Sequence, residues 1–382
     1  MSPTVSPAVG AAARPAKAPA IYAWEATDEA IAARYGLPLE RIVRFDLNTS
    51  PEAPAVAAAT LARGGFQPTL SEYPPSDYRR LVAAAAGAYG VQPDEILVAA
   101  GADEVLDVVA KAFLPPSGVA VIPVPTYGLY QVLTEQRGAQ AVAVPRRPAQ
   151  ERWALDLEAT VDAAIGAEVV WVCSPNNPTA TAEPDGAIET LLARLAAGAA
   201  RLGRRPPIVV LDEAYAEFTG RSLVALRERH PNLVVVRTAS KAYALAGLRV
   251  GFAVADAGTI AELARYRPPA SVSTISAAIV TDALLNPAAM LATVAAVEEE
   301  RGRLLEGLRG LGWEVGPSVT NFVLVDLGSP DRAAAVAATL LCRGIVPRTF
   351  GAGHPLAGFL RFTVRDAPGN ERLLEAAREA TR

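Results

Sequence analysis

The middle of the chain alternates between apolar runs and longer stretches with the apolar spacing of helices. The apolar runs cover residues 96–100, 119–125, 139–145, 168–174, 207–215, 233–240 and 249–255. They are apolar at successive positions instead of every second one, which is typical of strands buried on both faces of a parallel sheet. The pattern predicts an α/β fold: a mostly parallel seven-stranded sheet with helices on both faces.

The stretches between these runs predict the helices. We expect helices over residues 78–89, 101–113, 126–138, 155–164 and 184–202, and a further helix beginning in the small residues after Lys241. Past residue 286 the pattern changes to a long Ala, Leu and Glu-rich helix that runs to about Leu311. Short strands and two more helices follow it. This change predicts a smaller α+β domain at the C-terminal end.

The sequence therefore divides into four parts. Residues 1–20 are rich in Pro and Ala and predict a disordered leader, with prolines that interrupt any signal-peptide apolar core. Residues 21–70 form an N-terminal arm that we expect to pack on the small domain. Residues 71–285 form the large domain and residues 286–382 the small one. No run of about 18 apolar residues is present, so we expect no membrane-spanning helix.

Charge and composition narrow the classes of function. A net charge of −4 and a pI near 5.5 argue against nucleic acid as the main partner, because phosphate backbones bind basic surfaces. The only cysteines are Cys173 and Cys342, which indicates a reducing compartment, the cytoplasm, and no disulfide framework. With His230 and His354 as the only histidines, we expect neither a metal site nor a triad that needs several imidazoles.

One lysine stands out chemically. The chain holds three lysines against thirty-three arginines, and Lys241 follows directly after an apolar run. Arg stays protonated near neutral pH, whereas a Lys amine can lose its proton and attack a carbonyl. On its own, a Lys at a strand end is more often a solvated surface charge, so its neighbours decide between these interpretations.

Those neighbours follow the ends of other predicted strands. In a parallel sheet, ligands bind beyond the carboxyl ends of the strands. The residues found there are the helix start at 101–104, the pair Thr126-Tyr127, the turn 176–179 with its two asparagines, the stretch 212–215 with Asp212 and Tyr215, and Ser240 with Lys241. A helix start binds anions through its free N–H groups. Together these groups favour a planar, phosphorylated, pyridine-like aldehyde, and neither GxxxxGK[ST] nor a GxGxxG after a strand competes with it.

Four motifs carry a resemblance to a known family. In chain order they are PTYGLY (125–130), SPNNPT (174–179), DEAY (212–215) and RTASKAYALAGLRVGF (237–252). With these motifs the chain resembles the fold-type I pyridoxal-phosphate-dependent aminotransferases of class I/II, and within them the histidinol-phosphate aminotransferase branch. The similarity extends from Asn48 to Val364.

The resemblance implies a role for each motif residue. Lys241 forms the internal aldimine and moves the proton between Cα and C4′. Asp212 pairs with the pyridinium nitrogen, so that the ring accepts electrons. Tyr215 and Asn177 hydrogen-bond the phenolic oxygen of the ring, and Tyr127 stacks on its face.

The resemblance also implies how the anions and the subunits are held. The amides of Ala102 and Asp103, with Thr238, Ser240 and Arg249, bind the cofactor phosphate. Tyr73, in EYPP, reaches the cofactor of a neighbouring subunit, which makes the active unit a homodimer. Arg361 binds the anionic group of the substrate, and Arg348 is either a second contact or a solvent-facing charge. An isolated Arg361 guanidinium in a strand is costly to bury unless it faces an anion.

Two motifs depart from the family pattern. The branch has Leu-Asn-x-Asn-Glu-Asn-Pro-Tyr near its N-terminus, whereas residues 47–54 here read LNTSPEAP, which keeps Asn48 as a substrate-binding residue and lacks the tyrosine. Ala180 replaces the glycine of Asn-Pro-Thr-Gly. Ala fits there unless φ is positive.

The predicted function is a ping-pong transaminase of histidine biosynthesis. It moves an amino group between histidinol phosphate, or an aromatic amino acid, and 2-oxoglutarate. The alternative is a decarboxylase of a phosphorylated amino acid such as threonine phosphate, in which Lys241 and Asp212 keep their roles. A ligand-sensing module fused to a DNA-binding domain is disfavoured, because the segment before residue 40 is short and Pro/Ala-rich and the chain is acidic.

Overall fold

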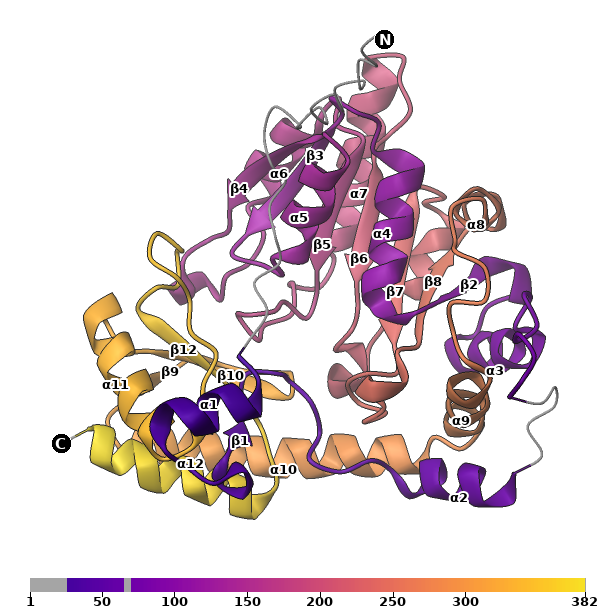
Figure 1. Cartoon of the computed structure of the whole chain (residues 1–382). Helices are drawn as coiled ribbons and strands as arrows, with labels where there is room; N and C mark the ends of the chain where they lie inside the picture. Colours follow the sequence, from indigo (N-terminus) through magenta and orange to yellow (C-terminus); the bar gives the residue numbers. More distant parts are fainter. Residues whose placement is uncertain (1–25, 65–69, 382) are drawn as a thin grey trace, which may run out of the picture.

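The computed structural model describes residues 26–64 and 70–381. The predicted leader lies outside this range, so its state stays a prediction. The described chain forms two parts: a large part around a seven-stranded sheet and a smaller part around a three-stranded sheet, with α10 running beneath both (Figure 1).

The large sheet has the predicted number and direction of strands. Its strand order is β2-β8-β7-β6-β5-β3-β4, with β8 antiparallel to both of its neighbours and all other pairs parallel. The strands are β2 (Ile96–Ala99), β3 (Val119–Val124), β4 (Gln140–Pro145), β5 (Val169–Cys173), β6 (Ile208–Asp212), β7 (Leu233–Thr238) and β8 (Gly251–Ala255). The predicted mostly parallel seven-stranded sheet is therefore confirmed.

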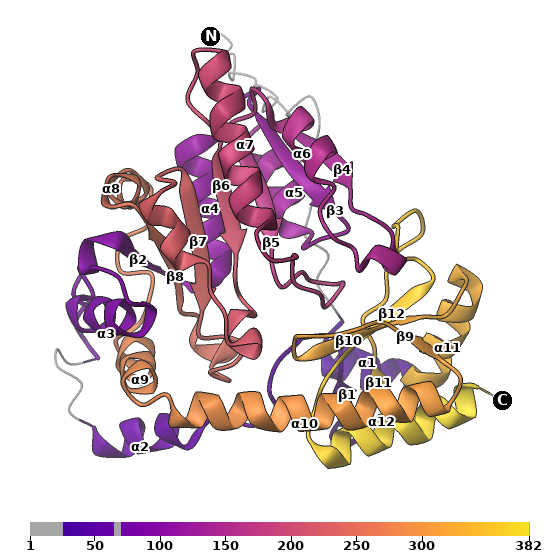
Figure 2. The same cartoon turned by 180° about the vertical axis from the view of Figure 1, so that it is seen from behind.

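Helices cover both faces of this sheet, which explains the unbroken apolar runs. One face packs against α4 (Gly101–Phe113), α5 (Leu129–Gln136) and α8 (Ala257–Ala264). The other packs against α3 (Arg79–Tyr89), α6 (Leu157–Ala164), α7 (Ala187–Arg201) and α9 (Thr274–Leu285). Figure 1 shows α4 and α5 in front of the sheet, and Figure 2 shows α6 and α7 on the opposite face. In β5, Val170 and Val172 enter one core and Trp171 the other.

The smaller part is the predicted α+β unit. Its sheet, of order β12-β10-β9, is antiparallel and consists of β9 (Glu314–Val315), β10 (Phe322–Asp326) and β12 (Phe359–Thr363). It shares one apolar core with α10 (Ala288–Gly310), α11 (Pro330–Cys342) and α12 (Ala367–Ala380).

The N-terminal segment packs on the smaller part, where we expected it, and also reaches the large part. After α1 (Asp28–Tyr35), strand β1 (Val43–Arg44) pairs in parallel with β11 (Ile345–Val346) of the smaller part. Helix α2 (Ala55–Arg63) instead packs beside α9 of the large part, and its Thr60 donates to Asp282 at 2.6 Å.

Capping side chains and a left-handed glycine fix the ends of several helices. Ser273 caps α9 by accepting the Ser276 N–H, and Asp156 caps α6 by accepting the Ala159 N–H. Gly90, at φ 68°, ends α3 in the left-handed conformation that glycine adopts without cost. Short 3-10 turns complete the structure at Leu39–Arg41, Pro93–Glu95, Ala149–Glu151, Ala216–Thr219, Val224–Glu228 and Ala246–Leu248.

The prediction of a helix directly after Lys241 was wrong. A tight turn and the single 3-10 turn at Ala246–Leu248 occupy that segment, and the next helix, α8, begins after β8. Helices α9 and α10 are broken at Pro287 and meet at a bend of 78°. Within the described ranges no single helix is long and apolar enough to cross a membrane, and only this bent pair reaches the required length together.

Candidate active site

A cavity of about 720 Å³ lies between the carboxyl ends of the large-sheet strands and the smaller part of the molecule. Its lining includes every predicted site residue except Tyr73: Asn48, Ala102, Asp103, Tyr127, Asn177, Asp212, Tyr215, Thr238, Ser240, Lys241, Arg249, Arg348 and Arg361. The residues of the large part converge there because parallel strands end at the same edge of the sheet, whereas Asn48 comes from the N-terminal segment and Arg348 and Arg361 come from the smaller part.

Lys241 lies in the turn after β7, with its side chain partly buried in the cavity. Its Nζ donates to the main-chain oxygen of Asn48 at 3.3 Å and lies 5.7 Å from the centre of the Tyr215 ring. Burial lowers the pKa of Lys241 to about 8, and the positive charges of Arg361 and Arg249 act in the same direction. The amine is therefore partly neutral in the mildly alkaline range, as a nucleophile or general base requires.

Asp212 ends β6 and is 4% exposed. Its Oδ1 accepts the Ala214 N–H at 3.0 Å, and its Oδ2 accepts the phenolic O–H of Tyr130 at 2.7 Å. Burial raises the pKa of this carboxyl to about 6, while these two hydrogen bonds oppose the rise. Sequence reasoning missed Tyr130, although it follows Tyr127 by three residues in the PTYGLY motif.

The start of α4 forms an anion cradle with Arg249. Gly101 has φ 83°, and a Cβ there would lie 2.5 Å from the Arg249 guanidinium. A Cβ on Gly251 would lie 2.4 Å from the main chain of Gly101, so only glycine lets β8 and α4 approach this closely. Free N–H groups at a helix start and a guanidinium together favour a phosphate.

Side chains around this cradle are held in place by one another. Asp103 accepts hydrogen bonds from Arg249 Nη2 at 3.0 Å and from the Tyr127 O–H at 3.1 Å. The hydroxyl of Thr238 donates to that of Ser240 at 2.9 Å. Tyr127 packs edge-on against Tyr130, with ring centres 5.7 Å apart.

Asn48 is a junction between the two parts of the molecule. It is 2% exposed and has φ 53°. Its amide Nδ2 donates to the Tyr215 oxygen at 3.0 Å, and its main-chain N–H donates to Thr363 Oγ1 at 2.9 Å. Its carbonyl accepts from Asn321 Nδ2 at 3.0 Å as well as from Lys241. Sequence reasoning missed Asn321.

Arg361 forms the wall of the cavity on the side of the smaller sheet. It is 7% exposed, and its Nη1 donates to Asn177 Oδ1 at 2.5 Å while Nη2 donates to the main-chain oxygen of Asp46. Its main chain pairs with that of Arg348 in a bridge with both N–H···O distances at 3.0 Å. The two arginines therefore line the cavity side by side, Arg361 from β12 and Arg348 from the segment after β11.

The loop after Arg348 adds two residues that sequence reasoning did not select. Phe350 and His354 both line the cavity, and their rings stack with centres 5.0 Å apart. Burial and the nearby Arg348 lower the pKa of His354. Its Nδ1 accepts the Leu356 N–H at 3.0 Å.

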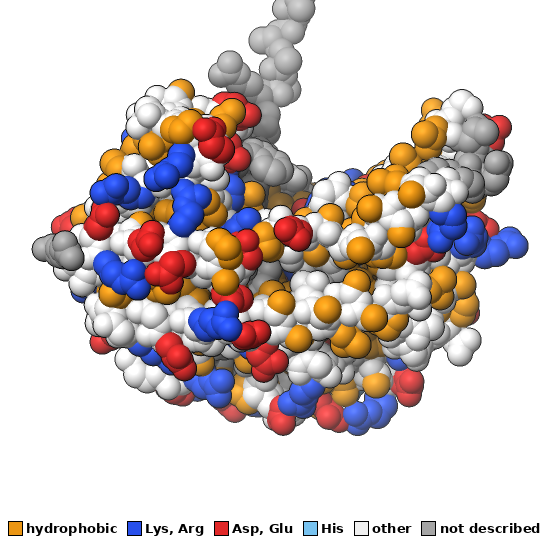
Figure 3. Space-filling view, turned by 90° about the horizontal axis from the view of Figure 1, so that it is seen from below, with side chains coloured by type: hydrophobic (Ala, Val, Ile, Leu, Met, Phe, Trp, Pro, Cys, Tyr) orange, Lys and Arg blue, Asp and Glu red, His pale blue; other side chains and the backbone are white. Residues whose placement is uncertain are grey.

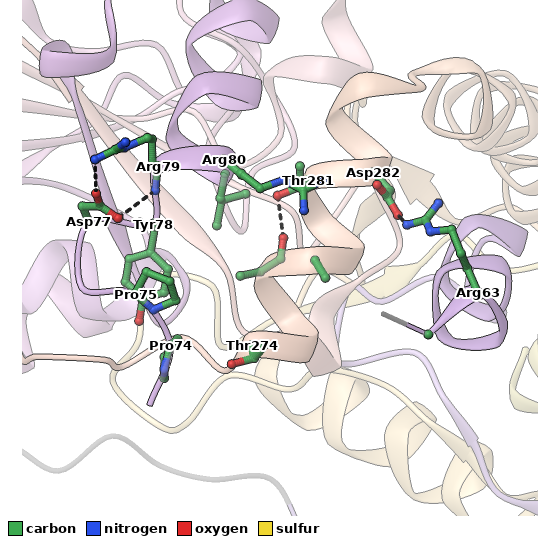
Figure 4. Close-up of a pocket in the computed structure, with 14 residues that line it drawn as sticks. Arg63, Pro74, Pro75, Asp77, Tyr78, Arg79, Arg80, Thr274, Thr281 and Asp282 are labelled. Atoms are coloured by element: carbon green, nitrogen blue, oxygen red, sulfur yellow. Dashed lines mark hydrogen bonds and ion pairs between the residues drawn. The ribbon is translucent and has the colours of Figure 1, made fainter. Parts of the chain in front are cut away.

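Tyr73 is the predicted site residue that this chain does not bring to the cavity. Its side chain is 89% exposed. It precedes Pro74 and Pro75, which line a second cavity of about 580 Å³ between this segment and α9 (Figure 4). Four of the charged groups there form ion pairs, Arg63 with Asp282 and Arg79 with Asp77. The second cavity lacks the lysine and the buried carboxyl, so we place the chemistry in the first.

The replacement of glycine by Ala180 has a structural cost. Ala180 is fully buried with φ 64°, a conformation that costs a non-glycine residue roughly 1–2 kcal/mol. Its buried methyl group returns about 0.8 kcal/mol. The departure from the family pattern therefore leaves a net cost of roughly 0.2–1.2 kcal/mol.

The residues fit the cofactor expected from the motifs. Asp212 offers a buried carboxylate, the α4 start with Arg249 offers a cradle that a Cβ would fill, and Lys241 offers an amine with a lowered pKa. These three features lie on three strand ends that face one cavity.

Comparison with known proteins gives a consistent result. The family model described as aminotransferase class I and II matches residues 42–379. A histidinol-phosphate aminotransferase of Roseiflexus castenholzii is 36% identical over 359 residues, which cover 92% of this chain and 93% of the relative. One of Thermococcus gammatolerans is 36% identical over 338 residues, covering 88% and 91%.

Solved structures share the fold. The histidinol-phosphate aminotransferase of Sinorhizobium meliloti, solved with pyridoxal-5'-phosphate, superposes with a TM-score of 0.84 at 24% identity, covering 94% of this chain and 95% of that chain. That of Clostridium acetobutylicum gives a TM-score of 0.79 at 22% identity, covering 89% and 99%.

Proposed function

The chain belongs to the class I and II aminotransferases, and we propose that within this family it transfers the amino group of histidinol phosphate to 2-oxoglutarate. The family, the enzyme class and the cofactor pyridoxal phosphate predicted from the motifs are confirmed. Its substrates are a small-molecule amino donor and an acceptor. The named pair and the ping-pong order are our proposal. Relatives called histidinol-phosphate aminotransferase, aligned over about nine-tenths of the chain, support histidinol phosphate as the amino donor.

One observation carries this proposal: the cavity has two separate cationic ends. Arg249 lies at the α4 start in the large part, and Arg361 with Arg348 lines the cavity from the smaller part. Lys241 and Asp212 lie in the same cavity. A cofactor phosphate and a substrate anion each need such a partner, and a guanidinium holds either in bidentate fashion.

The cofactor supplies an aromatic ring that accepts electrons from the substrate Cα. We propose that Asp212 holds the protonated ring nitrogen. Asn177 accepts from Arg361 through Oδ1, which leaves its Nδ2 to donate to the phenolic oxygen of the ring. Tyr215 accepts from Asn48, which leaves its own O–H to donate to the same oxygen.

The phosphate end and the proton transfer use the remaining residues. We propose that the amides of Ala102 and Asp103, with Thr238, Ser240 and Arg249, hold the phosphate, and that Tyr127 stacks on the ring. Lys241 Nζ takes the proton from the substrate Cα, and its lowered pKa suits an acceptor near neutral pH.

At the substrate end, Arg361 binds the anionic group and Arg348 is the second contact. Asn48 remains a proposed substrate residue, and its side chain is bonded to Tyr215 and Thr363. We therefore propose that it acts on the substrate through Tyr215.

A homodimer completes the site in this proposal. Tyr73 is exposed, so it is free to reach a second copy, and the exposed Leu61, Leu285 and Leu291 lie on α2, α9 and α10. Seen from below, the molecule shows hydrophobic side chains gathered over one half of its lower face (Figure 3). Burial of such a surface against a second chain is favourable. We also propose a cytoplasmic location, since both cysteines are free.

A half-reaction screen tests the proposed substrates. Holoenzyme is mixed with histidinol phosphate, aromatic amino acids or threonine phosphate in turn, and the absorbance of the bound cofactor is followed. We expect histidinol phosphate to bleach it fastest and 2-oxoglutarate to restore it with formation of glutamate. Release of carbon dioxide from threonine phosphate without glutamate would contradict the proposal and favour the decarboxylase.

A further inference from the structure

We propose that Tyr130 is a positioning residue for Asp212, which keeps the carboxylate ionised and oriented towards the ring nitrogen of the cofactor. The inference rests on the cofactor and on the role proposed above for Asp212, and it does not depend on which amine is the substrate.

The geometry places Tyr130 behind Asp212. The cavity lining includes Asp212 but, within the described residues, does not include Tyr130. The phenolic O–H donates to Oδ2 at 2.7 Å, and the Ala214 N–H donates to Oδ1 at 3.0 Å. A carboxylate accepts about four hydrogen bonds. The two contacts fix its plane from the protein side and leave acceptor capacity towards the cavity.

Tyr130 itself has little freedom to move. Its side chain is fully buried and stacks on Trp171, with ring centres 5.5 Å apart and planes inclined by 2°. The Trp171 indole N–H donates to Thr134 Oγ1 at 3.1 Å, and this hydroxyl donates to the main-chain oxygen of Tyr130 at 2.8 Å. The rigid support keeps the phenol aimed at one oxygen of the carboxylate, as a positioning residue requires.

Among the groups around Asp212, the Tyr130 hydrogen bond does most to keep the carboxyl ionised. Burial disfavours the ionised carboxylate, and among the groups that oppose burial the Tyr130 hydrogen bond is the largest, ahead of the Ala214 N–H. The other groups that face Asp212 are Asp103 on α4, which disfavours ionisation, Lys241, which favours it, and the neutral side chains of Cys173 on β5 and Tyr215. Without the phenol, we expect Asp212 to take up a proton at a higher pH.

The test is the pH dependence of cofactor affinity in Tyr130→Phe holoenzyme, measured by absorbance without any substrate. The change removes one oxygen and keeps the stacked ring. We expect the dissociation constant of the cofactor to rise roughly fivefold near pH 6 and to change less than about twofold near pH 8, because a one-unit rise from a pKa of about 6 lowers the ionised fraction of Asp212 about fivefold at pH 6 and hardly at all at pH 8. The acid limb of kcat should move to higher pH as well.

Tyr89→Phe is the matched control. Tyr89 is a partly buried tyrosine of the large part, and its buried phenolic oxygen has no hydrogen-bond partner among the described residues. Loss of the Tyr89 hydroxyl should leave cofactor affinity unchanged at both pH values. A double-mutant cycle adds a second readout: in an Asp212→Asn background, Tyr130→Phe should have no further effect on the pH dependence.

Two results would overturn the inference. One is a Tyr130→Phe protein whose cofactor affinity stays within about twofold of wild type at every pH. The other is an equal loss at all pH values, or an undiminished effect in the Asp212→Asn background, since either indicates a purely structural role. Because no amine is present, failure of the proposed substrate pair leaves this result unaffected.

Discussion

The amine of Lys241 donates to the main-chain oxygen of Asn48 at 3.3 Å, across 193 positions of the chain. The same oxygen accepts from Asn321, which directly precedes β10 of the smaller part. The Lys241 amine is therefore held by a carbonyl whose position depends on the N-terminal segment and the smaller sheet. A shift of the smaller part relative to the large one would change the geometry at Lys241.

The conformation of Asn48 gives the first prediction. Glycine adopts φ 53° without cost, whereas alanine there is strained. We expect Asn48→Ala to lower the free energy of unfolding by roughly 0.5–1 kcal/mol more than Asn48→Gly, as measured by urea denaturation. Both variants lose the hydrogen bond to Tyr215, so both should lose activity to a similar extent. Equal stability of the two variants would contradict the strained geometry.

The second prediction concerns Asp212 and pH. Burial raises its pKa to about 6 from the unfolded value of 3.8, so the unfolded state releases this proton more easily than the folded state. The carboxyl thus destabilises the cofactor-free fold progressively from pH 3.8 to about 6, and fully above that. We expect Asp212→Asn to raise the free energy of unfolding near pH 7 by up to about 3 kcal/mol and to abolish activity.

Denaturation of cofactor-free protein near pH 4 and near pH 7 checks this sign. The stability difference between wild type and Asp212→Asn should be small at the lower pH and large at the higher one. A variant that is less stable than wild type at both values would show that Asp212 is net stabilising, against our account.

The third prediction separates substrate binding from cofactor binding. Arg361 donates through both Nη atoms, to Asn177 and to the Asp46 carbonyl, and a Lys cannot reproduce this planar fork. We expect Arg361→Lys to raise the KM for 2-oxoglutarate roughly 30-fold or more, which corresponds to about 2 kcal/mol, while cofactor content stays near that of wild type. Arg343→Lys, on an exposed ion pair with Glu379, is the matched control. An unchanged KM would remove Arg361 from the substrate site.

The fourth prediction tests the shared site. If Tyr73 serves the partner subunit, a Tyr73→Ala chain and a Lys241→Ala chain are each nearly inactive alone. Mixed subunits should recover activity, because a mixed dimer has one site with both residues intact. Gel filtration should give a dimer for all three samples. Absence of recovery in confirmed mixed dimers would place Tyr73 outside the neighbouring site.

Much of the fold could be predicted because its strands are buried on both faces. Ile96–Ala99 and Val169–Cys173 read as unbroken apolar runs, and helix α4 has the predicted bounds. Helix α9 was missed because its residues are apolar nearly all round, which gives no amphipathic signal. The helix expected after Lys241 was wrong, since a turn there lets Arg249 reach the α4 start.

The site could be predicted where chemistry follows a strand end. Asp212, Asn177 and Lys241 are examples, and all three line the cavity. Residues that are hydrogen-bonded to the site from distant positions gave no such signal: Tyr130 is 82 positions from Asp212, and Asn321 is 273 positions from Asn48. The sequence also did not reveal unusual backbone conformations, such as the positive φ of Ala180.

The most direct test of the account is borohydride reduction of the protein with pyridoxal phosphate, followed by peptide mass spectrometry. The chain has only Lys17, Lys111 and Lys241, so each site is separately identifiable. We predict one pyridoxyl group, on the peptide that contains Lys241, a yellow colour that Lys241→Ala lacks, and a loss of kcat of at least about a thousandfold in that variant. Labelling at Lys111 instead, or no label on wild-type protein, would contradict the assignment of Lys241 as the cofactor lysine.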